Sequence, residues 1–388
     1  MIPYSRQSIT DEDILAVSQT LKSDFLTQGP AVPAFEDALK NQFSVQHAIA
    51  CSSGTAALHL AYASLGVDLN TIGIVPTITF AATANAFRYL GATVKFCDVD
   101  PQTGLLCLES LDAILKKISP KSCPCPVVIS PVSLAGALAP LAEVSQRVNP
   151  LGFKVIEDAS HSPGAFKTSN NRVDKSASCE HTDAACLSFH PVKHICSGEG
   201  GAILTNDNSI AKKAEKLRSH GIERPYDEGH ETPWFYKQTA LGWNYRMTDF
   251  QASLGKSQLG RLDEQLATRR EIAKKYNQAF TCAPFNQHLD CPSLTSGHSW
   301  HLYVLRFKQK GWRDKAHKFL KEKGILTQIH YIPLYKHPYY QPLVEKVAFP
   351  GSEEYFDSCL SIPMFPGLTS EEQNTVIEEI GHFIALLG

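Results

Sequence analysis

One lysine stands apart from the others in this chain of 388 residues. Lys193 lies in SFHPVKHICSGEGG, between an apolar segment that ends at Ser188 and a glycine-rich turn, whereas Lys212, Lys213 and Lys216 lie in a charged, helix-like stretch. A lysine in a pocket that is poor in water has a lowered pKa, so its neutral amine can attack carbonyl carbons. A lysine considered singly is more often a solvated surface residue. Lys193 is therefore a candidate nucleophile whose assignment depends on its neighbours.

Two further segments place polar groups where buried strands are expected to end. Ser53, Gly54 and Thr55 separate the apolar AIAC from the alanine-rich AALHLAYASLG. Their backbone N–H groups would open a helix, and such groups attract anions. Asp158 ends the apolar KVIED, where a buried carboxylate needs a cation or hydrogen-bond donors. Taken singly, the first segment could be a capped turn, and Asp158 could pair with an arginine or cap a helix.

Together these residues match what pyridoxal 5′-phosphate (PLP) requires. The phosphate carries roughly −1.5 to −2 charges, which suit the helix start at Ser53–Thr55. Asp158 would keep the pyridine nitrogen protonated, and Lys193 would bind the aldehyde carbon and move protons. Phe80, in TITFAATANA, would stack on the ring. His161 would contact Asp158 or the ring, or be an ordinary polar residue of a loop.

The pattern of apolar segments predicts the elements that position these residues. IGIV, TVKFCDV, PVVISPV, KVIEDA, AACLSF and GAIL alternate with helix-like stretches such as Ser110–Ile118 and Leu141–Val148. This alternation predicts an α/β fold with a mostly parallel sheet, of the seven-stranded type, covered by helices. After about residue 245, one long amphipathic helix spanning Leu254–Phe280 and a mixed segment with a strand at Ile329–Ile332 predict a smaller α+β domain. We expect a large domain at 1–250 and a small C-terminal domain at 251–388.

Composition narrows the functional classes. The chain is 43% hydrophobic and 20% charged with a net charge of −2, which argues against a general nucleic-acid surface. No signal peptide and no apolar run of roughly 18 residues are apparent, so we expect a soluble cytoplasmic protein without a membrane partner. The 11 cysteines are expected to be reduced. Cys179 and Cys186 with His181 and His190 could form a zinc site, but buried cysteines on neighbouring strands are favoured, so no metal is expected.

The chain resembles the DegT-type nucleotide-sugar aminotransferases, which are PLP enzymes of fold type I. CSSGTAALHLA, TFAATANA, VIEDASHSPGA, SFHPVKHICSGEGGAILTND, GWNYRMTDFQASLGKSQL and TQIHYIPLY occur in the order found in that family. The resemblance implies that Lys193 forms the Schiff base and that Asp158 holds the pyridine nitrogen. It also implies that Asn244 reaches the phosphate from a partner subunit, and hence a homodimer with shared active sites. The cofactor-binding residues expected are Ser53, Gly54, Thr55, Phe80, Asp158, His161, Ser188, Lys193 and, from the resemblance alone, Asn244.

The resemblance also implies a substrate. PYSRQSI, SFHPVK and TQIHYIPLY are most similar to the branch of the family that serves pseudaminic acid biosynthesis. That branch transfers the amino group of glutamate, through pyridoxamine 5′-phosphate, to C4 of a UDP-linked 4-keto-6-deoxy-N-acetylhexosamine (UDP-2-acetamido-2,6-dideoxy-β-L-arabino-hex-4-ulose). Packing alone would explain Tyr4 and Leu26 equally well. The substrate-binding positions implied are Tyr4, Leu26, Thr27, Gln28, Gly29, Ser53, Ser188, Asn244, Ile329, His330, Tyr331 and Ile332.

Three alternatives remain at this point. The first is an aminotransferase of the same family that acts on another nucleotide-linked keto sugar. The second is a nicotinamide enzyme, which would need a G-x-G-x-x-G turn that the GEGG of this chain does not supply. The third is a non-catalytic member of the PLP fold, which the complete set of Lys193, Asp158 and Ser188 disfavours.

Overall fold

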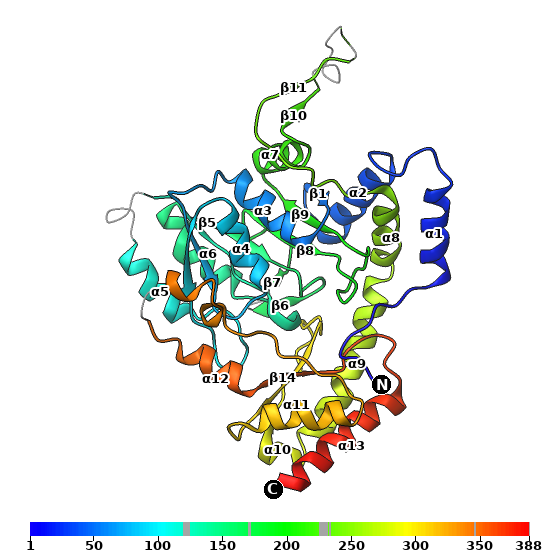
Figure 1. Cartoon of the computed structure of the whole chain (residues 1–388), viewed down its shortest axis with the longest axis vertical. Helices are drawn as coiled ribbons and strands as arrows, with labels where there is room; N and C mark the ends of the chain where they lie inside the picture. Colours follow the sequence, from blue (N-terminus) through cyan, green and yellow to red (C-terminus); the bar gives the residue numbers. More distant parts are fainter. Residues whose placement is uncertain (119–124, 170–171, 225–231, 233, 345–346, 388) are drawn as a thin grey trace.

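A computed structural model describes residues 1–118, 125–169, 172–224, 232, 234–344 and 347–387 (Figure 1). Its centre is a seven-stranded sheet in which β9 runs antiparallel to both of its neighbours and the other pairs are parallel. The prediction of a mostly parallel sheet is therefore confirmed. In spatial order the strands are β1 (His47–Cys51), β9 (Gly201–Thr205), β8 (Ala184–Ser188), β5 (Lys154–Asp158), β4 (Val127–Ile129), β2 (Ile72–Pro76) and β3 (Thr93–Cys97).

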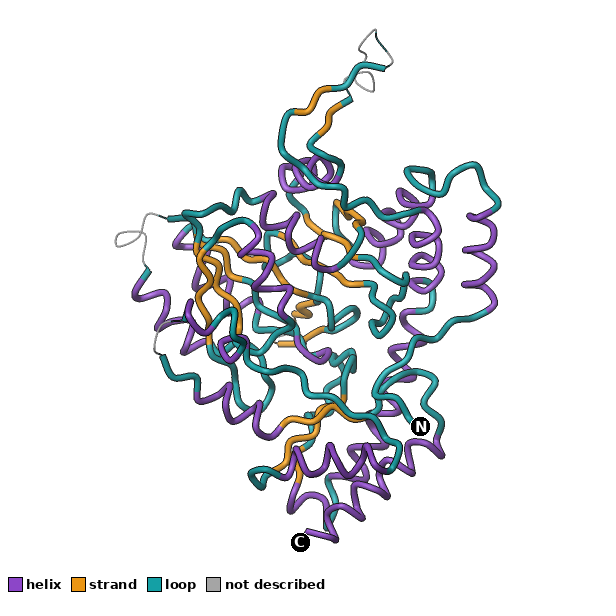
Figure 2. The backbone as a smooth tube through the Cα atoms, viewed as in Figure 1, coloured by secondary structure: helices purple, strands orange, loops and turns teal. Residues whose placement is uncertain are grey.

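Helices cover both faces of this sheet (Figure 2). Successive side chains of a strand point to opposite faces, so Cys186 packs with one helical layer and Leu187 with the other. On the first face lie α3 (Gly54–Ser64), α4 (Ala81–Tyr89) and α7 (Asn208–Arg218). On the second face lie α2 (Ala31–Phe43), α5 (Leu108–Lys117), α6 (Leu141–Val148) and α8 (Asp249–Leu259).

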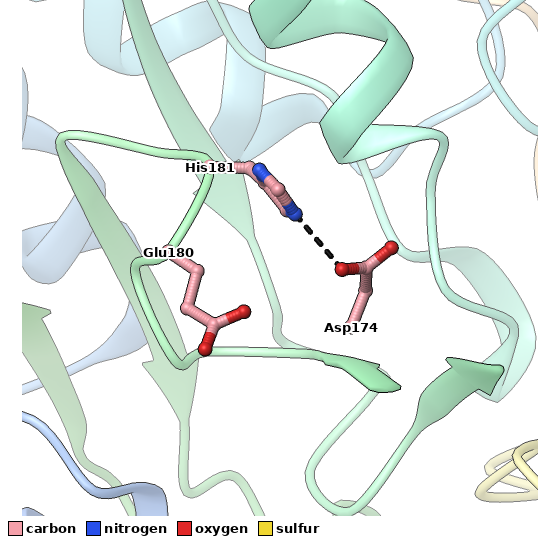
Figure 3. Close-up of side chains that lie close together, drawn as sticks. All are labelled: Asp174, Glu180 and His181. Carbon is pink, nitrogen blue, oxygen red and sulfur yellow. Dashed lines mark hydrogen bonds and ion pairs between the residues drawn. The ribbon is translucent and has the colours of Figure 1, made fainter. Parts of the chain in front are cut away.

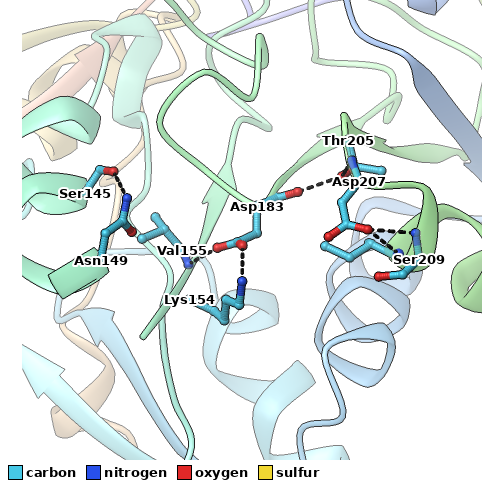
Figure 4. Close-up of polar contacts among 9 residues, drawn as sticks. Ser145, Asn149, Lys154, Val155, Asp183, Thr205, Asp207 and Ser209 are labelled. Carbon is cyan, nitrogen blue, oxygen red and sulfur yellow. Dashed lines mark hydrogen bonds and ion pairs between the residues drawn. The ribbon is translucent and has the colours of Figure 1, made fainter. Parts of the chain in front are cut away.

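Polar contacts fix the sheet at the ends where β5 and β8 begin (Figure 4). Asp183 accepts hydrogen bonds from Val155 N at 2.8 Å and from Lys154 Nζ at 2.7 Å. Thr205 Oγ1 donates to the carbonyl oxygen of Asp183 at 2.6 Å, which ties in the end of β9. Asp207 then caps α7 by accepting from Ser209 N at 2.7 Å. The strands that carry the candidate site at their other ends are thus held in register.

The C-terminal part builds on a three-stranded antiparallel sheet of β12 (Leu289–Asp290), β13 (Tyr303–Phe307) and β14 (Cys359–Ile362). Both chain termini lie at this end of the molecule (Figure 1). The two-domain division at residue 250 stays a prediction. The helices of this part are α9 (Leu262–Phe280), α10 (Phe285–His288), α11 (Trp312–Glu322), α12 (Pro350–Ser358) and α13 (Ser370–Leu387).

Two sequence-based expectations about this part are wrong. The single helix expected over Leu254–Phe280 is interrupted, because Arg261 has φ −110° and ψ 11° and so separates α8 from α9. Glycine at position 260 is a poor helix-interior residue and favours the break. The strand expected at Ile329–Ile332 is not present, since this segment joins no ladder and bends at His330, and an isolated bridge joins the preceding Gln328 to Ser361. Pro333, which has no backbone N–H, follows the segment and does not permit a longer ladder.

The remaining elements lie at the periphery. They are α1 (Asp11–Leu21), the hairpin of β6 (Phe166–Ser169) and β7 (Arg172–Lys175), and an arm made by β10 (Ile222–Glu223) and β11 (Lys237–Gln238) that projects beyond α7 (Figure 1). None of the described helices combines the length and the apolar character needed to cross a bilayer. Nine described cysteines are free thiols, whereas Cys125 is disulfide-bonded, so the expectation of reduced cysteines is wrong at that position. Cys123 lies outside the described residues.

Candidate active site

A cavity of about 630 Å³ opens where five strands of the large sheet end or have just ended. Ser53–Thr55 follow β1, Phe80 follows β2 and Val132 follows β4, while Asp158 and Ser188 end β5 and β8. Ligands of open α/β sheets bind at this edge. The predicted site residues that line the cavity are Tyr4, Ser53, Gly54, Thr55, Phe80, Asp158, His161, Ser188, Lys193, Ile329, His330, Tyr331 and Ile332.

Lys193 lies in the loop that joins the antiparallel strands β8 and β9. Both ends of this loop are fixed, because Ser188 pairs with Gly201 and Phe189 N donates to the carbonyl oxygen of Gly200 at 2.8 Å. Burial lowers the pKa of Lys193 to about 8, although the nearby carboxylate of Asp158 opposes this change. A substantial fraction of the amine is therefore neutral near pH 7 to 8, the state in which it can attack a carbonyl carbon.

Asp158 is held by hydrogen bonds and not by a counterion. Its carboxylate accepts from Thr83 Oγ1 at 2.7 Å and from Ser160 N at 3.1 Å, and Thr83 in turn lies 2.7 Å from Thr79 Oγ1. No ion pair of the described residues includes Asp158, so the alternative of an arginine partner is wrong. The acid is 5% exposed and faces the cavity, where a protonated ring nitrogen would supply the missing positive charge.

The start of α3 forms the anion-binding part of the cavity. Ser53 is the N-cap, since its hydroxyl oxygen accepts from Ala56 N at 3.1 Å. A Cβ atom on Gly54 would lie 2.8 Å from Ser188 Cβ, so only glycine lets the helix start approach the end of β8 this closely. Thr55 and Ser188 add hydroxyl groups to the free N–H groups of the first turn. This cradle fits a phosphate group.

His161 makes contacts that the sequence did not indicate. Its Nδ1 accepts from Ala135 N at 3.4 Å, its Nε2 lies 3.2 Å from Tyr331 Oη, and its ring centroid lies 4.3 Å from that of His301. These hydrogen-bond partners replace the expected contact with Asp158. Burial is the main cause that lowers the pKa of His161 well below its usual range, so the imidazole is neutral.

Five predicted residues lie elsewhere in the chain fold. Gly29 N donates to Asp249 Oδ2 at 2.9 Å and Thr27 pairs with Thr248, which places the 26–29 segment against α8. Asn244 is exposed and pairs with Ser219. The predicted residues that do not line the cavity are Leu26, Thr27, Gln28, Gly29 and Asn244.

Sequence reasoning missed functional residues both behind the cavity lining and in it. Thr83, which holds Asp158, lies 75 positions before it, and the TITFAATANA segment was interpreted only through Phe80. His301 lines the cavity, and its signal was the polar first residue of HLYVLRF. Among the described residues that line the cavity, Lys193 is the only lysine or arginine. A ligand with several negative charges would therefore find few cations in one chain.

A separate polar cluster consists of Asp174, Glu180 and His181 (Figure 3), and none of the three lines the cavity. Asp174 Oδ1 is 2.9 Å from His181 Nε2, and Glu180 lies beside them. Arg172 is paired with Asp174 at 3.2 Å and with Glu180 at 3.5 Å, so it supplies the positive charge that the carboxylates need. Cys179 Sγ contacts the carbonyl oxygen of Leu204 at 3.2 Å and does not belong to the cluster. An ion-pair network accounts for this arrangement.

The sheet topology and the cavity define a transferase of fold type I. The chain belongs to the DegT/DnrJ/EryC1/StrS aminotransferase family, whose model matches residues 7–381. It is 35% identical, over 94% of this chain and 92% of the relative, to the UDP-4-amino-4,6-dideoxy-N-acetyl-β-L-altrosamine transaminase of Campylobacter jejuni. Among solved structures it is similar to Helicobacter pylori PseC, an aminotransferase involved in the biosynthesis of pseudoaminic acid, with a TM-score of 0.88, 28% identity and 98% of each chain covered. It is also similar to Spr1654 from Streptococcus pneumoniae in its PLP-form, with a TM-score of 0.86, 25% identity and 98% of each chain covered.

Proposed function

We propose that this protein is a PLP-dependent aminotransferase that transfers the amino group of glutamate to C4 of UDP-2-acetamido-2,6-dideoxy-β-L-arabino-hex-4-ulose. The product would be UDP-4-amino-4,6-dideoxy-N-acetyl-β-L-altrosamine. The observation that carries the proposal is the buried amine of Lys193, with its pKa lowered to about 8, in one cavity with Asp158 and the start of α3. The similarity to the Campylobacter jejuni transaminase supports this choice of sugar.

The residues of the cavity fit PLP, which when bound supplies an aldehyde for amines and a ring that accommodates negative charge. The first turn of α3, with Thr55 and Ser188, would hold the phosphate. Asp158, kept in place by Thr83 and Ser160 N, would hold a proton on the ring nitrogen. Phe80 is 59% exposed and lines the cavity, and it would stack on the ring.

Lys193 would act in both halves of the reaction. Its amine is neutral often enough at pH 7 to 8 to accept a proton from the carbon that bears the glutamate nitrogen. In the second half it would return a proton at C4 of the sugar. His330, whose pKa burial lowers to about 3, and Tyr331 would contact the sugar as uncharged groups.

We further propose a homodimer in which each subunit completes the site of the other. This idea explains why Leu26–Gly29 and Asn244, which the resemblance assigns to the site, lie outside the cavity of their own chain. Phe25 and Leu26 are 52% and 49% exposed, which suits an interface. A partner could also supply the cations that the cavity of one chain lacks. The cytoplasmic location stays a prediction.

Subunit complementation tests the shared site. Lys193→Ala and Asn244→Ala variants should each be inactive. After they are mixed, unfolded and refolded together, half of the dimers are hybrids, and each hybrid has one site with both native residues. Activity should return to about a quarter of the wild-type value. If each site instead takes both residues from one chain, no activity returns.

The assay of function uses purified protein, PLP, glutamate and UDP-linked 4-keto sugars that differ at C5. We expect the β-L-arabino sugar to be aminated fastest, with the product identified by NMR. Borohydride should fix PLP to the peptide that contains Lys193. Faster turnover of a C5 epimer would favour the alternative, an enzyme of the same family for another nucleotide-linked keto sugar. Failure to fix PLP on Lys193 would refute the cofactor assignment.

A further inference from the structure

His161 and Tyr331, which both line the cavity, form a hydrogen bond, and a backbone N–H group determines which of the two is the donor. Ala135 N donates to His161 Nδ1, and His161 Nε2 lies 3.2 Å from Tyr331 Oη. A neutral imidazole carries a single N–H group. Because Nδ1 accepts from the backbone, the hydrogen must lie on Nε2. His161 therefore donates to Tyr331 Oη, and the tyrosine oxygen is the acceptor.

The turn that presents the Ala135 N–H group has an unusual backbone. Ala135 has φ 58° and Gly136 has φ 104°, and the first value is uncommon for a residue that is not glycine. The carbonyl oxygen of Gly136 accepts from Ser299 N at 2.9 Å, which fastens the turn to the segment before β13. Such a conformation persists only where the surrounding structure fixes it, and it clusters at functional sites. Here it determines the tautomer of His161.

We propose that Tyr331 donates its hydroxyl hydrogen to an oxygen atom of the ligand bound beside Lys193. The tyrosine oxygen already accepts from His161, and among the described residues no acceptor takes its hydrogen. Tyr331 lines the cavity, and its ring centroid lies 6.0 Å from that of Phe80. Burial raises the pKa of Tyr331, so the hydroxyl group keeps its hydrogen at any pH at which the protein works. His161 is then a positioning residue for this donor.

The inference rests on the proposed function, which supplies two oxygen atoms of the required chemistry. One is the phenolic oxygen on the pyridine ring of PLP, and the other is the keto oxygen at C4 of the sugar. Both are carbonyl-like or phenolate-like acceptors, and both would lie close to the Lys193 amine. Tyr331→Phe removes the donor and keeps the ring, so it isolates the hydrogen bond.

The experiment has two arms. In the first, the absorbance of the PLP-loaded protein is titrated with pH. If Tyr331 donates to the ring oxygen, Tyr331→Phe destabilises the deprotonated oxygen and raises the midpoint by about one pH unit, a tenfold change in that equilibrium. In the second, each half-reaction is followed in a single turnover. If Tyr331 donates to the keto oxygen, the reaction with the sugar slows by about tenfold or more, while the reaction with glutamate is unchanged.

Two controls separate a directed hydrogen bond from general damage. Tyr340→Phe removes another buried hydroxyl contact, at 2.6 Å to Asn85 Oδ1 outside the cavity, and should change neither measurement. In a His161→Gln background, whose side-chain N–H group can still donate to Tyr331 Oη, Tyr331→Phe should keep its effect on the two measurements. In a His161→Leu background, Tyr331→Phe should have a smaller effect, since the donor is no longer oriented.

The outcomes distinguish this inference from the proposed function. A shift in either arm supports the inference and identifies the accepting oxygen. A Tyr331→Phe protein that matches wild type in both arms overturns the inference alone. A wild-type protein that takes up no PLP overturns the proposed function and this inference together.

Discussion

The electrostatic coupling between Asp158 and Lys193 leads to an unusual expectation for the cofactor-free protein. At pH 7, a lysine with a pKa of 10.5 is neutral in only about 0.03% of molecules, whereas Lys193, with its pKa of about 8, is neutral in about 9%. The Asp158 carboxylate raises this pKa. Asp158→Asn should therefore lower it further and increase the neutral fraction, by at most about elevenfold at pH 7, where the amine would be fully neutral.

Reductive alkylation measures this fraction. The cofactor-free protein is treated with a small neutral aldehyde and cyanoborohydride, and mass spectrometry quantifies the label on the peptide that contains Lys193. The exposed Lys212 provides an internal reference. The labelling rate of Asp158→Asn should exceed that of wild type at pH 7, and the two rates should converge by pH 10 because both amines are then neutral. The same variant should lose most transaminase activity.

A matched control removes a carboxylate from the opposite end of the same strands. Asp183 pairs with Lys154 at 2.7 Å where β5 and β8 begin, so Asp183→Asn should leave the labelling of Lys193 unchanged. An Asp158→Asn protein that folds normally but labels Lys193 no faster than wild type would refute the electrostatic reasoning. In an unfolded protein, Lys193 would label with the pH dependence of the exposed Lys212, which distinguishes unfolding from the expected result.

Three further predictions concern the free energy of unfolding, measured with denaturant. In the cofactor-free protein, Lys193→Met should raise the free energy of unfolding at pH 7 by about 3 kcal/mol, because holding the buried amine protonated costs stability. This gain should fade as the pH approaches 10.5, where the amine is neutral in the folded state. An equal gain at pH 7 and at pH 10.5 would contradict the prediction. Gly136→Ala should lower the free energy of unfolding by more than about 2 kcal/mol, since φ is 104° and the new Cβ atom would lie 2.6 Å from Trp300 N. Gly152→Ala is the control: φ is 73° there but the new Cβ atom meets no other atom, so the loss of stability should be smaller. Arg269→Met should lower the free energy of unfolding by about 3 kcal/mol, since three buried carbonyl groups lose their hydrogen-bond donor. Arg269→Lys should recover part of this loss, and an Arg269→Met protein as stable as wild type would contradict the prediction.

Most strands of the large sheet, and the residues Lys193 and Asp158, could be predicted from local patterns in the sequence. Asp158 and Ser188 each end an apolar segment, and parallel neighbouring strands bring such ends to one edge of a sheet. The helix expected at Leu141–Val148 has those bounds in the structure. The direction of the strands is harder to predict from the sequence. The strand β9 is antiparallel to its neighbours because of how the chain returns after Lys193, and the residues of β9 do not indicate this direction.

The failures concern contacts between distant segments. The hydrogen bond from Thr83 to Asp158 joins two segments through the tertiary fold, and a threonine near the start of a helix has many other roles. The contact between Ala135 and His161 depends on a left-handed turn, which alanine does not signal. The break at Arg261 was missed because the leucine pattern continues in phase on both sides of it.

The walls of the cavity have separate origins in the chain. The reactive lysine, its carboxylate and the phosphate cradle all come from ends of the large sheet, whereas Tyr4 and residues 328–332 come from the N-terminal segment and from the stretch after α11. Backbone hydrogen bonds join Tyr4 to Met364 and Gln328 to Ser361. Ser5 Oγ donates to the carbonyl oxygen of Val192 at 3.5 Å, in the loop that carries Lys193. Tyr331 belongs to this second wall and pairs with His161, so it ties the wall to the chemistry. A redesign that keeps Tyr331 could exchange the other residues of the wall to alter sugar preference while retaining Lys193 and Asp158.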